Sequence, residues 1–292
     1  MRLSREQLES FGRDGFVLVP DCFAAAEVTV MKAELPSLFG EDSPRRVSEA
    51  GGASVRSVYG SHTTNEVFGL LGRHPLLVGP ARQLLDSEVY IYQFKINAKA
   101  AFDGDVWDWH QDYIFWRKED GMPSARVVNA AIFLDDVTEF NGPLYLIPGS
   151  HREGMIDAAA ADVLASYARE QVSAYGDSPE WVTNLTAKIK YSVDRPDVLR
   201  LATRYGIAAP KGPAGSVLYF DSNLVHASPA NISPFDRTVV FVTYNSVANL
   251  PRLGEDARPD FLVGRDFRPI MPVGRDALLT LGRDELAEST TR

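Results

Sequence analysis

The stretch "WDWHQDYIFWRKEDGMP", residues 107–123, places a histidine and a carboxylate two positions apart in aromatic surroundings. The two residues are His110 and Asp112. Residues two apart on a β-strand point to the same face of the sheet. We therefore expect both side chains to face the inside of a barrel, where they can hold one metal ion. Histidine is scarce in the rest of the chain, where it occurs only as His62, His74, His151 and His226.

His226 is the best-placed third ligand. It follows the apolar run "GSVLYF" (215–220) and comes just before the last long strand that we expect. A His-x-Asp pair with a distant histidine is the two-histidine, one-carboxylate facial triad, which leaves three positions of an octahedral ion open. Iron(II) is the metal usually bound in this way. On its own, the pair is also explained by a core histidine that is hydrogen-bonded to a carboxylate.

Arg237 lies eleven residues after His226, at the head of an apolar strand. A buried guanidinium needs an anionic partner. Its planar fork suits the carboxylate of a ligand in bidentate fashion. The alternative is an internal salt bridge to a nearby aspartate.

The wider pattern becomes rich in strands from residue 88 onward. Strands are expected at 89–97, 126–136, 143–150, 215–220 and 237–247, with further short strands at 16–20 and 186–193. The dipeptide Asn141-Gly142 indicates a turn before one of them. Strands separated by turns, with helices mainly near the start, predict a mainly β fold with flanking helices, of the β-sandwich or jelly-roll type.

Helices are expected mostly in the first part of the chain. Ser4 and Gln7 form a capping box for a helix that runs to about Arg13 and stops near Gly15. Further helices are expected at 24–39 (with a kink at Pro36), 74–86, 157–174 and 196–206, and residues 41–61 are predicted to be a long mobile loop. No repeat or linker divides the chain. We expect one domain, 1–292, with a helical part to about residue 87, a core at about 88–250 and a tail at 251–292.

Composition excludes several classes of protein. The formal net charge is −9, whereas nucleic-acid and anionic-membrane surfaces need clustered Lys and Arg. No run of eighteen apolar residues occurs, and the polar start is not a secretory signal. The lone Cys22 excludes an internal disulfide and a cysteine metal cluster. We expect a cytoplasmic enzyme with a small-molecule substrate, and leave open whether it is a monomer or a homodimer.

Around the three candidate metal ligands and Arg237, the chain resembles the phytanoyl-CoA dioxygenase (PhyH)-like branch of the iron(II)/2-oxoglutarate oxygenases. Within this branch it is most similar to the ectoine hydroxylase group, whose motif reads F-x-W-H-S-D-F-E-T-W-H-x-E-D-G-M-P. The match covers Trp109, His110, Asp112, Trp116 and 119–123, and continues in 92–97, 140–151, 209–237 and 244–249.

The resemblance implies a double-stranded β-helix (cupin-like) core that binds iron through His110, Asp112 and His226. It implies that 2-oxoglutarate chelates the metal and that Arg237 pairs with the far carboxylate of this cosubstrate. Oxygen is the second cosubstrate, and the implied reaction hydroxylates an unactivated C–H bond while 2-oxoglutarate becomes succinate and carbon dioxide. The family positions that surround the cosubstrate correspond to Gln93, Asn97, Trp116 and Ser228. Ordinary turn and strand-edge hydrogen bonding is the alternative for the polar members of this set.

The chain departs from the ectoine group between the metal ligands and the end of the motif. The departures are Gln111, Tyr113, Ile114, Phe115 and Arg117. Phe115 replaces a threonine that lies against the substrate in that group. We therefore expect the same chemistry on another small molecule, with Phe115, Trp116 and Arg117 as substrate contacts. A free amino acid, an amino-acid derivative or a natural-product intermediate would suit.

Other functions remain as alternatives. The chain could be an ectoine 5-hydroxylase, or an oxidase of the same fold that desaturates or cyclises its substrate. A halogenase needs Gly or Ala in place of the carboxylate ligand, so Asp112 argues against it. A zinc hydrolase could use the triad but would not need Arg237, and a non-catalytic jelly roll has no reason to keep the triad.

The remaining histidines and tryptophans are expected to be structural. His62 and His74 are predicted to be surface or capping residues, and His151 to order a turn. Trp107 and Trp109 are predicted to belong to the core.

Overall fold

Two antiparallel β-sheets form the body of the computed structural model, which describes residues 1–49, 54–156, 185 and 189–282. The larger sheet has the strand order β1 (Phe16–Val19), β8 (Val217–Asp221), β6 (Val127–Phe133), β10 (Arg237–Ser246), β4 (Val89–Lys99), β3 (Val55–Tyr59) and β2 (Arg46–Ser48). The smaller sheet has the order β5 (Trp107–His110), β9 (His226–Ser228) and β7 (Tyr145–Leu146). The jelly-roll fold expected from the sequence is confirmed.

Side chains of the large sheet alternate between its two faces. On β6, Val128 and Ile132 pack in an apolar cluster with the helices, whereas Ala131 and Phe133 pack in a second cluster that reaches the small sheet through Leu146. Because both faces are covered, all ten residues of β10 are buried. Polar residues that alternate with the helix-facing positions therefore point between the two sheets.

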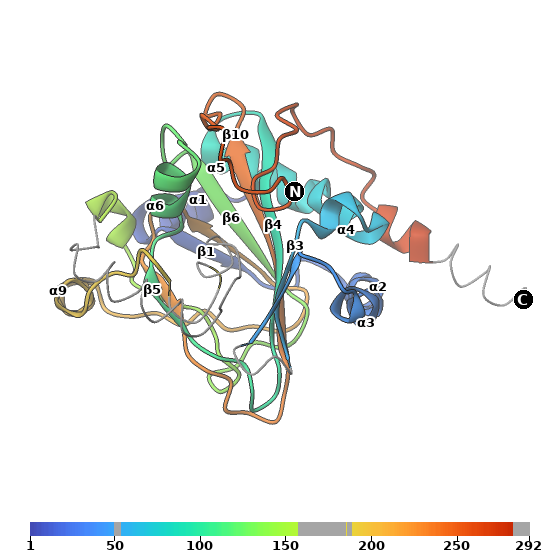
Figure 1. The fold of residues 1–292 in the computed structure, drawn as a ribbon, viewed down its shortest axis with the longest axis horizontal. Helices are drawn as coiled ribbons and strands as arrows, with labels where there is room; N and C mark the ends of the chain where they lie inside the picture. Colours follow the sequence, from blue (N-terminus) through green and yellow to red (C-terminus); the bar gives the residue numbers. More distant parts are fainter. Residues whose placement is uncertain (50–53, 157–184, 186–188, 283–292) are drawn as a thin grey trace, which may run out of the picture.

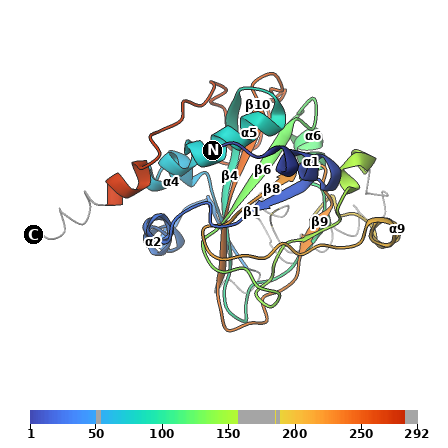
Figure 2. The same cartoon turned by 180° about the vertical axis from the view of Figure 1, so that it is seen from behind.

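Helices cover the outer face of the large sheet. These are α1 (Arg5–Asp14), α2 (Ala25–Ala33), α3 (Leu35–Gly40), α4 (Glu66–Gly72) and α5 (Pro75–Leu85), and each contributes to the outer apolar cluster. α6 (Asp112–Glu119) and α9 (Arg195–Tyr205) lie on the opposite side of the molecule from α2 and α4 (Figure 1), and the view from behind shows the same separation (Figure 2). In the described part of the chain, 3₁₀ turns form η1 (Ser61–Thr63) and η2 (Ser150–Glu153).

The first helix follows the sequence prediction closely. Ser4 and Gln7 form the capping box, and Gly15 ends α1 with a φ of 82°, a conformation that favours glycine. The helix expected at 24–39 is interrupted at Glu34, and Pro36 lies in the first turn of α3, where its missing N–H is tolerated. Cys22 is buried in the outer apolar cluster.

Residues 41–61 were expected to form a long mobile loop, and this prediction is wrong. β2 and β3 lie in this segment and form an antiparallel pair, and β3 also pairs with β4. The apolar residues Val47, Val58 and Tyr59 are buried and support these short strands among the polar residues that suggested a loop. The helix expected at 157–174 lies outside the described residues, as do residues 186–188 of the strand expected at 186–193. The described part of that segment, residues 189–193, is not a strand, since only Ser192 forms an isolated bridge, to His110, so this prediction is wrong there.

The segment after β10 packs along β4. The backbone N–H of Gly264 donates to the carbonyl of Tyr92 at 2.6 Å, and that of Ile270 donates to the carbonyl of Val89 at 2.9 Å. Leu262 is fully buried in a cluster beside the first half of β4. The tail is therefore packed against the first half of β4. Among the described residues, no helix has the length and apolar character needed to cross a bilayer.

Candidate metal centre and cosubstrate pocket

His110, Asp112 and His226 converge on one point. Their ligand atoms all lie within 4.8 Å of one another, and all three side chains are buried. Nε2 of His110 lies 3.8 Å from Oδ1 of Asp112, and Nε2 of His226 lies 3.9 Å from Oδ2. No other group of three potential ligands occurs in the part of the chain that the structure describes.

Backbone carbonyl groups orient both imidazole rings. Nδ1 of His110 lies 2.6 Å from the carbonyl oxygen of Asp108, and Nδ1 of His226 lies 2.9 Å from that of Leu224. A carbonyl oxygen can only accept a hydrogen bond, so each Nδ1 carries the proton. This tautomer leaves the Nε2 lone pair of each ring for a metal ion.

Asp112 reaches the site by a different route from the one expected. β5 ends at His110, and Asp112 is the first residue of α6, so the prediction that one strand carries both ligands is wrong. The chain turns at Gln111, whose side-chain amide donates to the carbonyls of Gly154 and Asn223 at 2.8 and 2.5 Å. The N-terminal turn of a helix also favours a carboxylate through the helix dipole.

Asn129 fixes the orientation of the carboxylate. Its Nδ2 donates to Oδ2 of Asp112 at 2.8 Å, and its Oδ1 accepts from the hydroxyl of Thr243 at 2.7 Å. Asn129 and Thr243 are register partners on β6 and β10, and both are buried. A metal-ligating carboxylate is typically held by such an outer hydrogen bond.

The electrostatics of the site suit a cation. Burial alone would raise the pKa of Asp112, but Lys95, the two histidines and Asn129 together bring it below its usual value. Burial lowers the pKa of His110 to about 3 and also lowers that of His226. At neutral pH the site therefore presents two neutral imidazoles and one carboxylate, the forms in which these groups bind metals. The donor set fits iron(II).

Arg237 is a buried cation on a strand next to the site. Its Nε and Nη2 donate to the carbonyl of Gly142 at 3.1 and 2.6 Å, and Nη2 also donates to the hydroxyl of Ser228 at 3.1 Å. Ser228 is two residues after His226 on β9, so both side chains share a face. Arg237 forms no salt bridge within the described residues, so the alternative of an internal ion pair is not observed there. Burial lowers its pKa to about 10, which keeps it charged at neutral pH.

Lys99 is the register partner of Arg237 on β4, and the sequence reasoning missed it. Its Nζ donates to the carbonyls of Asp105 and Pro229 at 2.5 and 2.6 Å. Burial, together with the neighbouring guanidinium, lowers the pKa of Lys99 to about 6. An anion bound between the two cations would favour its charged form. Lys99 could have been identified from the sequence, because polar residues alternate with apolar ones along β4.

A small pocket opens beside the triad. Its lining residues are Tyr59, Gln93, Lys95, Trp107, His110, Asp112, Phe115, Trp116, Leu185, Ile189 and Arg258. The expected contacts Gln93, Phe115 and Trp116 are therefore brought to the site. Gln93 donates to the carbonyl of Leu262 at 2.9 Å, and the ring of Phe115 lies edge-on to that of His110 at 6.4 Å.

Asn97 and Arg117 do not line this pocket. Asn97 is buried further along β4, and its Oδ1 has no hydrogen-bond partner within the described residues. Arg117 is exposed on α6, and its Nη1 donates to the carbonyls of Met122 and Pro123 at 3.3 and 3.4 Å. The structure therefore offers no contact between Arg117 and the site.

The sequence reasoning also missed six residues that line the pocket, which are Tyr59, Lys95, Trp107, Leu185, Ile189 and Arg258. Lys95 lies between Gln93 and Asn97 on the same face of β4, so strand periodicity could have found it. Trp107, expected in the core, lines the pocket, and its ring lies 3.9 Å from the guanidinium carbon of Arg56. Arg258 comes from the tail, where no local motif indicated a role.

His74 and His151 have the structural roles expected of them. His74 caps α5, since its Nδ1 accepts from the N–H of Leu76, and His151 lies in η2 with Nε2 3.3 Å from the carbonyl oxygen of Gly12. Trp109 packs against a small apolar cluster, as expected.

Known proteins are similar to this chain in sequence and in fold. The chain is 41% identical over 268 residues to L-proline trans-4-hydroxylase of Streptomyces griseoviridis, covering 92% of this chain and 95% of the relative. It is 37% identical over 281 residues to ectoine dioxygenase of Bordetella bronchiseptica, covering 93% and 86%. The crystal structure of EctD from S. alaskensis with 2-oxoglutarate and 5-hydroxyectoine superposes with a TM-score of 0.76 at 33% identity, covering 93% of this chain and 87% of that one. A structure of the same enzyme with bound Fe gives a TM-score of 0.74 at 32% identity over the same shares.

The fold and the donor set define a 2-oxoglutarate-dependent non-haem iron dioxygenase. The phytanoyl-CoA dioxygenase (PhyH) profile matches residues 11–239, and this chain belongs to that family.

Proposed function

We propose that this protein hydroxylates an unactivated C–H bond of a small free amino acid, with L-proline and related cyclic amino acids as the first candidates. The observation that carries the reaction class is the buried triad with both Nε2 atoms and a carboxylate directed to one point. When bound, iron(II) supplies the oxygen activation that couples conversion of 2-oxoglutarate to succinate and carbon dioxide with insertion of one oxygen atom into the substrate.

The residues of this chain provide binding and orientation. His110, Asp112 and His226 hold the metal, and Asn129 keeps the carboxylate in place. Arg237 meets the distal carboxylate of 2-oxoglutarate, with Ser228, Asn97, Gln93 and Trp116 around the cosubstrate. The apolar side chains of Phe115, Leu185 and Ile189 limit the access of water to the reacting centre.

The choice of an amino acid rests on three points. The similarity to L-proline trans-4-hydroxylase extends over nearly the whole of both chains. Phe115 offers an apolar wall of suitable size for a small ring. Lys95 lines the pocket and provides a cation that a substrate carboxylate could meet, a role that Arg117 cannot take from its exposed position. Arg258 also lines the pocket, but its charge is balanced by Asp120, to which it donates two hydrogen bonds of 2.9 and 2.6 Å.

Ectoine is the second candidate substrate, because several relatives are ectoine dioxygenases. Phe115 disfavours it: a threonine hydroxyl is lost, and a polar ring would meet a bulkier wall. An oxidase that desaturates or cyclises its substrate has the same requirements at the metal. The mass of the product separates these outcomes, since hydroxylation adds 16 daltons and desaturation removes two hydrogen atoms.

The experiment is a substrate screen with purified protein, iron(II) and 2-oxoglutarate. The panel contains L-proline, L-pipecolate, acyclic amino acids and ectoine, and the readouts are succinate release and a 16-dalton mass gain. His226→Ala and zinc in place of iron(II) are the negative controls. Substrate-stimulated succinate release without a hydroxylated product would contradict hydroxylation, and preferred turnover of ectoine would overturn the proposed substrate class.

The setting of the reaction is also a proposal. We infer a cytoplasmic enzyme, folded as one domain, that acts without nucleic acid or a membrane. The acidic net charge of −9 supports this inference. Both a monomer and a homodimer are compatible with a site built from one chain.

A further inference from the structure

Arg56 occupies a β-bulge on β3. Val47 on β2 lies opposite Ser57 on β3. The next residue of β2 lies opposite Val55, so the pairing skips Arg56 and leaves it without a partner on β2. A bulge of this kind re-aims a side chain, and such bulges are frequent next to active sites. The direction of the Arg56 side chain is therefore set by the bulge and not by the regular alternation of the strand.

All three nitrogen atoms of the Arg56 guanidinium donate hydrogen bonds. Nη1 donates to Oε2 of Glu49 at 2.9 Å. Nη2 donates to the carbonyl of Val106 at 2.7 Å, and Nε donates to the carbonyl of Leu185 at 3.1 Å. The exposed fractions of the Arg56 and Glu49 side chains are 1% and 8%, so the ion pair is shielded from solvent. These bonds connect β3 to the end of β2, to the residue before β5 and to Leu185.

The flat face of the guanidinium packs on Trp107. The guanidinium carbon of Arg56 lies 3.9 Å from the centroid of the Trp107 ring, within the range of a cation–π contact. Trp107 and Leu185 both line the pocket beside the triad, whereas Arg56 is not among its lining residues. Arg56 therefore lies behind the pocket and contacts two of its lining residues from that side.

A buried ion pair contributes little to stability by itself. The loss of hydration of both charges offsets much of their attraction, and well-packed apolar side chains at such a place are often as stable or more stable. A guanidinium differs from an apolar side chain in its direction-dependent bonding, since its N–H groups lie in one fixed plane. Bonds from this plane to Glu49, Val106 and Leu185 restrict the position of Arg56. The ring of Trp107 and the backbone of Leu185 are thereby restricted as well.

We propose that Arg56 is a positioning residue that holds Trp107 and Leu185 in the arrangement that fits the substrate. It acts through these two lining residues and touches neither the substrate nor a metal ligand. This assignment rests on the proposed function, because it places Arg56 on the substrate side of that site. With Arg56 in place, the substrate is held so that oxidation of its C–H bond keeps step with the conversion of 2-oxoglutarate.

Arg56→Lys is the first variant, because it keeps the charge beside Glu49 but loses the planar fork. Binding of the substrate that the screen identifies is measured by calorimetry on protein loaded with iron(II) and 2-oxoglutarate, without oxygen. We expect the dissociation constant to rise about tenfold, as for the loss of a desolvated cation–π contact. Iron content and the affinity for 2-oxoglutarate should stay within about twofold, since the charge is kept. In air, the ratio of hydroxylated product to succinate should fall, because a displaced substrate is oxidised less often for each succinate formed.

Arg56→Met combined with Glu49→Gln is the second variant. It removes the ion pair without leaving a buried carboxylate unpaired, so the protein should fold even where Arg56→Lys does not. This variant should show the same loss of substrate binding and the same fall in the ratio of product to succinate.

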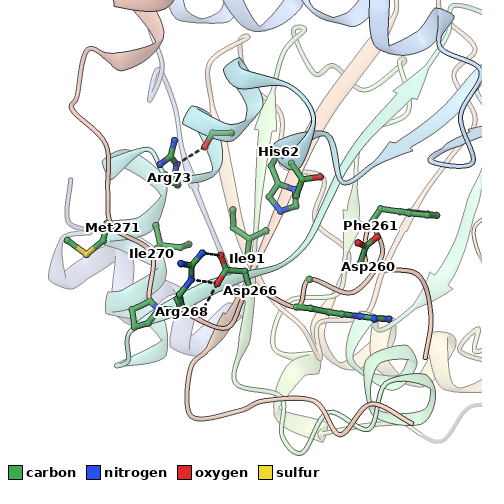
Figure 3. A pocket seen from close by; sticks show the side chains of 14 residues that line it. His62, Arg73, Ile91, Asp260, Phe261, Asp266, Arg268, Ile270 and Met271 are labelled. Carbon is green, nitrogen blue, oxygen red and sulfur yellow. Dashed lines mark hydrogen bonds and ion pairs between the residues drawn. The ribbon is translucent and has the colours of Figure 1, made fainter. Parts of the chain in front are cut away.

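Arg45→Lys is the matched control. Arg45 lies immediately before β2, and its guanidinium carbon lies 5.2 Å from the centroid of the Phe261 ring. Phe261 lines a separate cavity of about 680 Å³, which shares no lining residue with the pocket beside the triad (Figure 3). The same change of arginine to lysine over an aromatic ring should therefore leave substrate binding within about twofold of the wild type.

A double-mutant cycle tests whether Arg56 acts through Trp107. Indole is the best aromatic partner for a cation, so the guanidinium has a weaker hold on the ring in a Trp107→Phe background. In that background, Arg56→Lys should change substrate binding by less than about threefold.

Three results would overturn this assignment and leave the proposed function intact. The first is unchanged substrate binding in the Arg56 variants, and the second is a loss of iron content and 2-oxoglutarate affinity as large as the loss of substrate binding, which would indicate general structural damage. The third is an equal effect of Arg56→Lys with and without Trp107. A screen in which no small molecule binds or reacts would instead overturn the proposed function, and the role of Arg56 with it.

Discussion

His110 and His226 are direct partners on the antiparallel strands β5 and β9, and their ring centroids lie 4.1 Å apart. Side chains of such a pair project from the same face of the sheet, so strand register alone brings the two imidazoles together. Both rings are buried, and both point Nε2 away from the carbonyl that holds Nδ1. The third ligand, Asp112, enters from the first turn of α6 and completes the site from outside the sheet.

Replacing His226 with Ala should remove the metal and the activity together. The protein loses one of three ligands, and a two-ligand site should hold iron(II) at least about a hundredfold more weakly, more than is typical for loss of an outer-shell partner. Iron content after gel filtration and succinate release measure the two effects. His151→Ala is the matched control, because His151 is not a metal ligand: its ring lies in η2 with Nε2 3.3 Å from the carbonyl oxygen of Gly12 in α1, so this variant should retain both iron and activity. Normal iron content in the His226 variant would show that the triad is assigned wrongly.

Replacing Asn129 with Ala should weaken metal binding without removing a ligand. The carboxylate of Asp112 loses its orienting hydrogen bond, and such outer partners typically contribute about 10–100-fold in metal affinity or activity. Competition with a chelator measures the affinity. Thr243→Val removes only the next hydrogen bond in the chain and should have a smaller effect. Equal iron affinity in wild type and Asn129→Ala would contradict a role for this contact.

The sequence was sufficient to predict the jelly roll and the grouping of His110, Asp112 and His226, because the fold follows from strand patterning and the three ligands stand in motifs that resemble a known family. The role of Arg237 toward the cosubstrate stays a prediction. The sequence prediction misplaced Asp112 because a strand and the first turn of a helix can both follow His110, and the choice depends on contacts of Gln111 with distant carbonyls. Lys95 and Lys99 could have been identified from the alternation of polar and apolar residues along β4. Arg258 could not have been identified in this way, because its place in the pocket depends on how the tail packs against β4 and Asp120.

Replacing Arg237 with Ala should raise the concentration of 2-oxoglutarate required for turnover. Removing one partner of a buried charge pair costs about 2–5 kcal/mol, which corresponds to roughly thirty to several thousandfold in affinity. Arg237→Lys keeps the charge but loses the planar fork, so its loss should be smaller. The apparent affinity is measured by succinate release as 2-oxoglutarate is varied. An unchanged value in the Ala variant would mean that another group, such as Lys99, holds the distal carboxylate.

Replacing Phe115 with Thr should shift selectivity from amino acids toward ectoine. The ring packs against His110 and Tyr191 in the wild type, and its removal makes room and restores a hydroxyl beside the metal. A buried polar group left unpaired costs about 1–3 kcal/mol, so selectivity should change by tenfold to more than a hundredfold. Direct competition between L-proline and ectoine, with both proteins side by side, measures the ratio. Wild-type protein that already prefers ectoine would show that Phe115 does not exclude it.

Replacing His62 with Phe should make stability less sensitive to acid. The folded pKa of His62 is about 4, below the value of about 6.5 for an unfolded histidine. Between these two pH values the unfolded chain binds a proton that the folded protein does not, so the free energy of unfolding falls as the pH drops from about 6.5 to 4. The contribution of one such group is at most about 1.4 kcal/mol per pH unit. Urea unfolding at pH 7 and pH 5 measures it, and the difference between the two proteins isolates this group from other titrating residues.

The phenylalanine can keep the stacking on Phe94, so the variant should fold, and His62→Gln provides a second variant without a titrating ring. The same loss of stability between pH 7 and pH 5 in all three proteins would show that His62 is not held neutral.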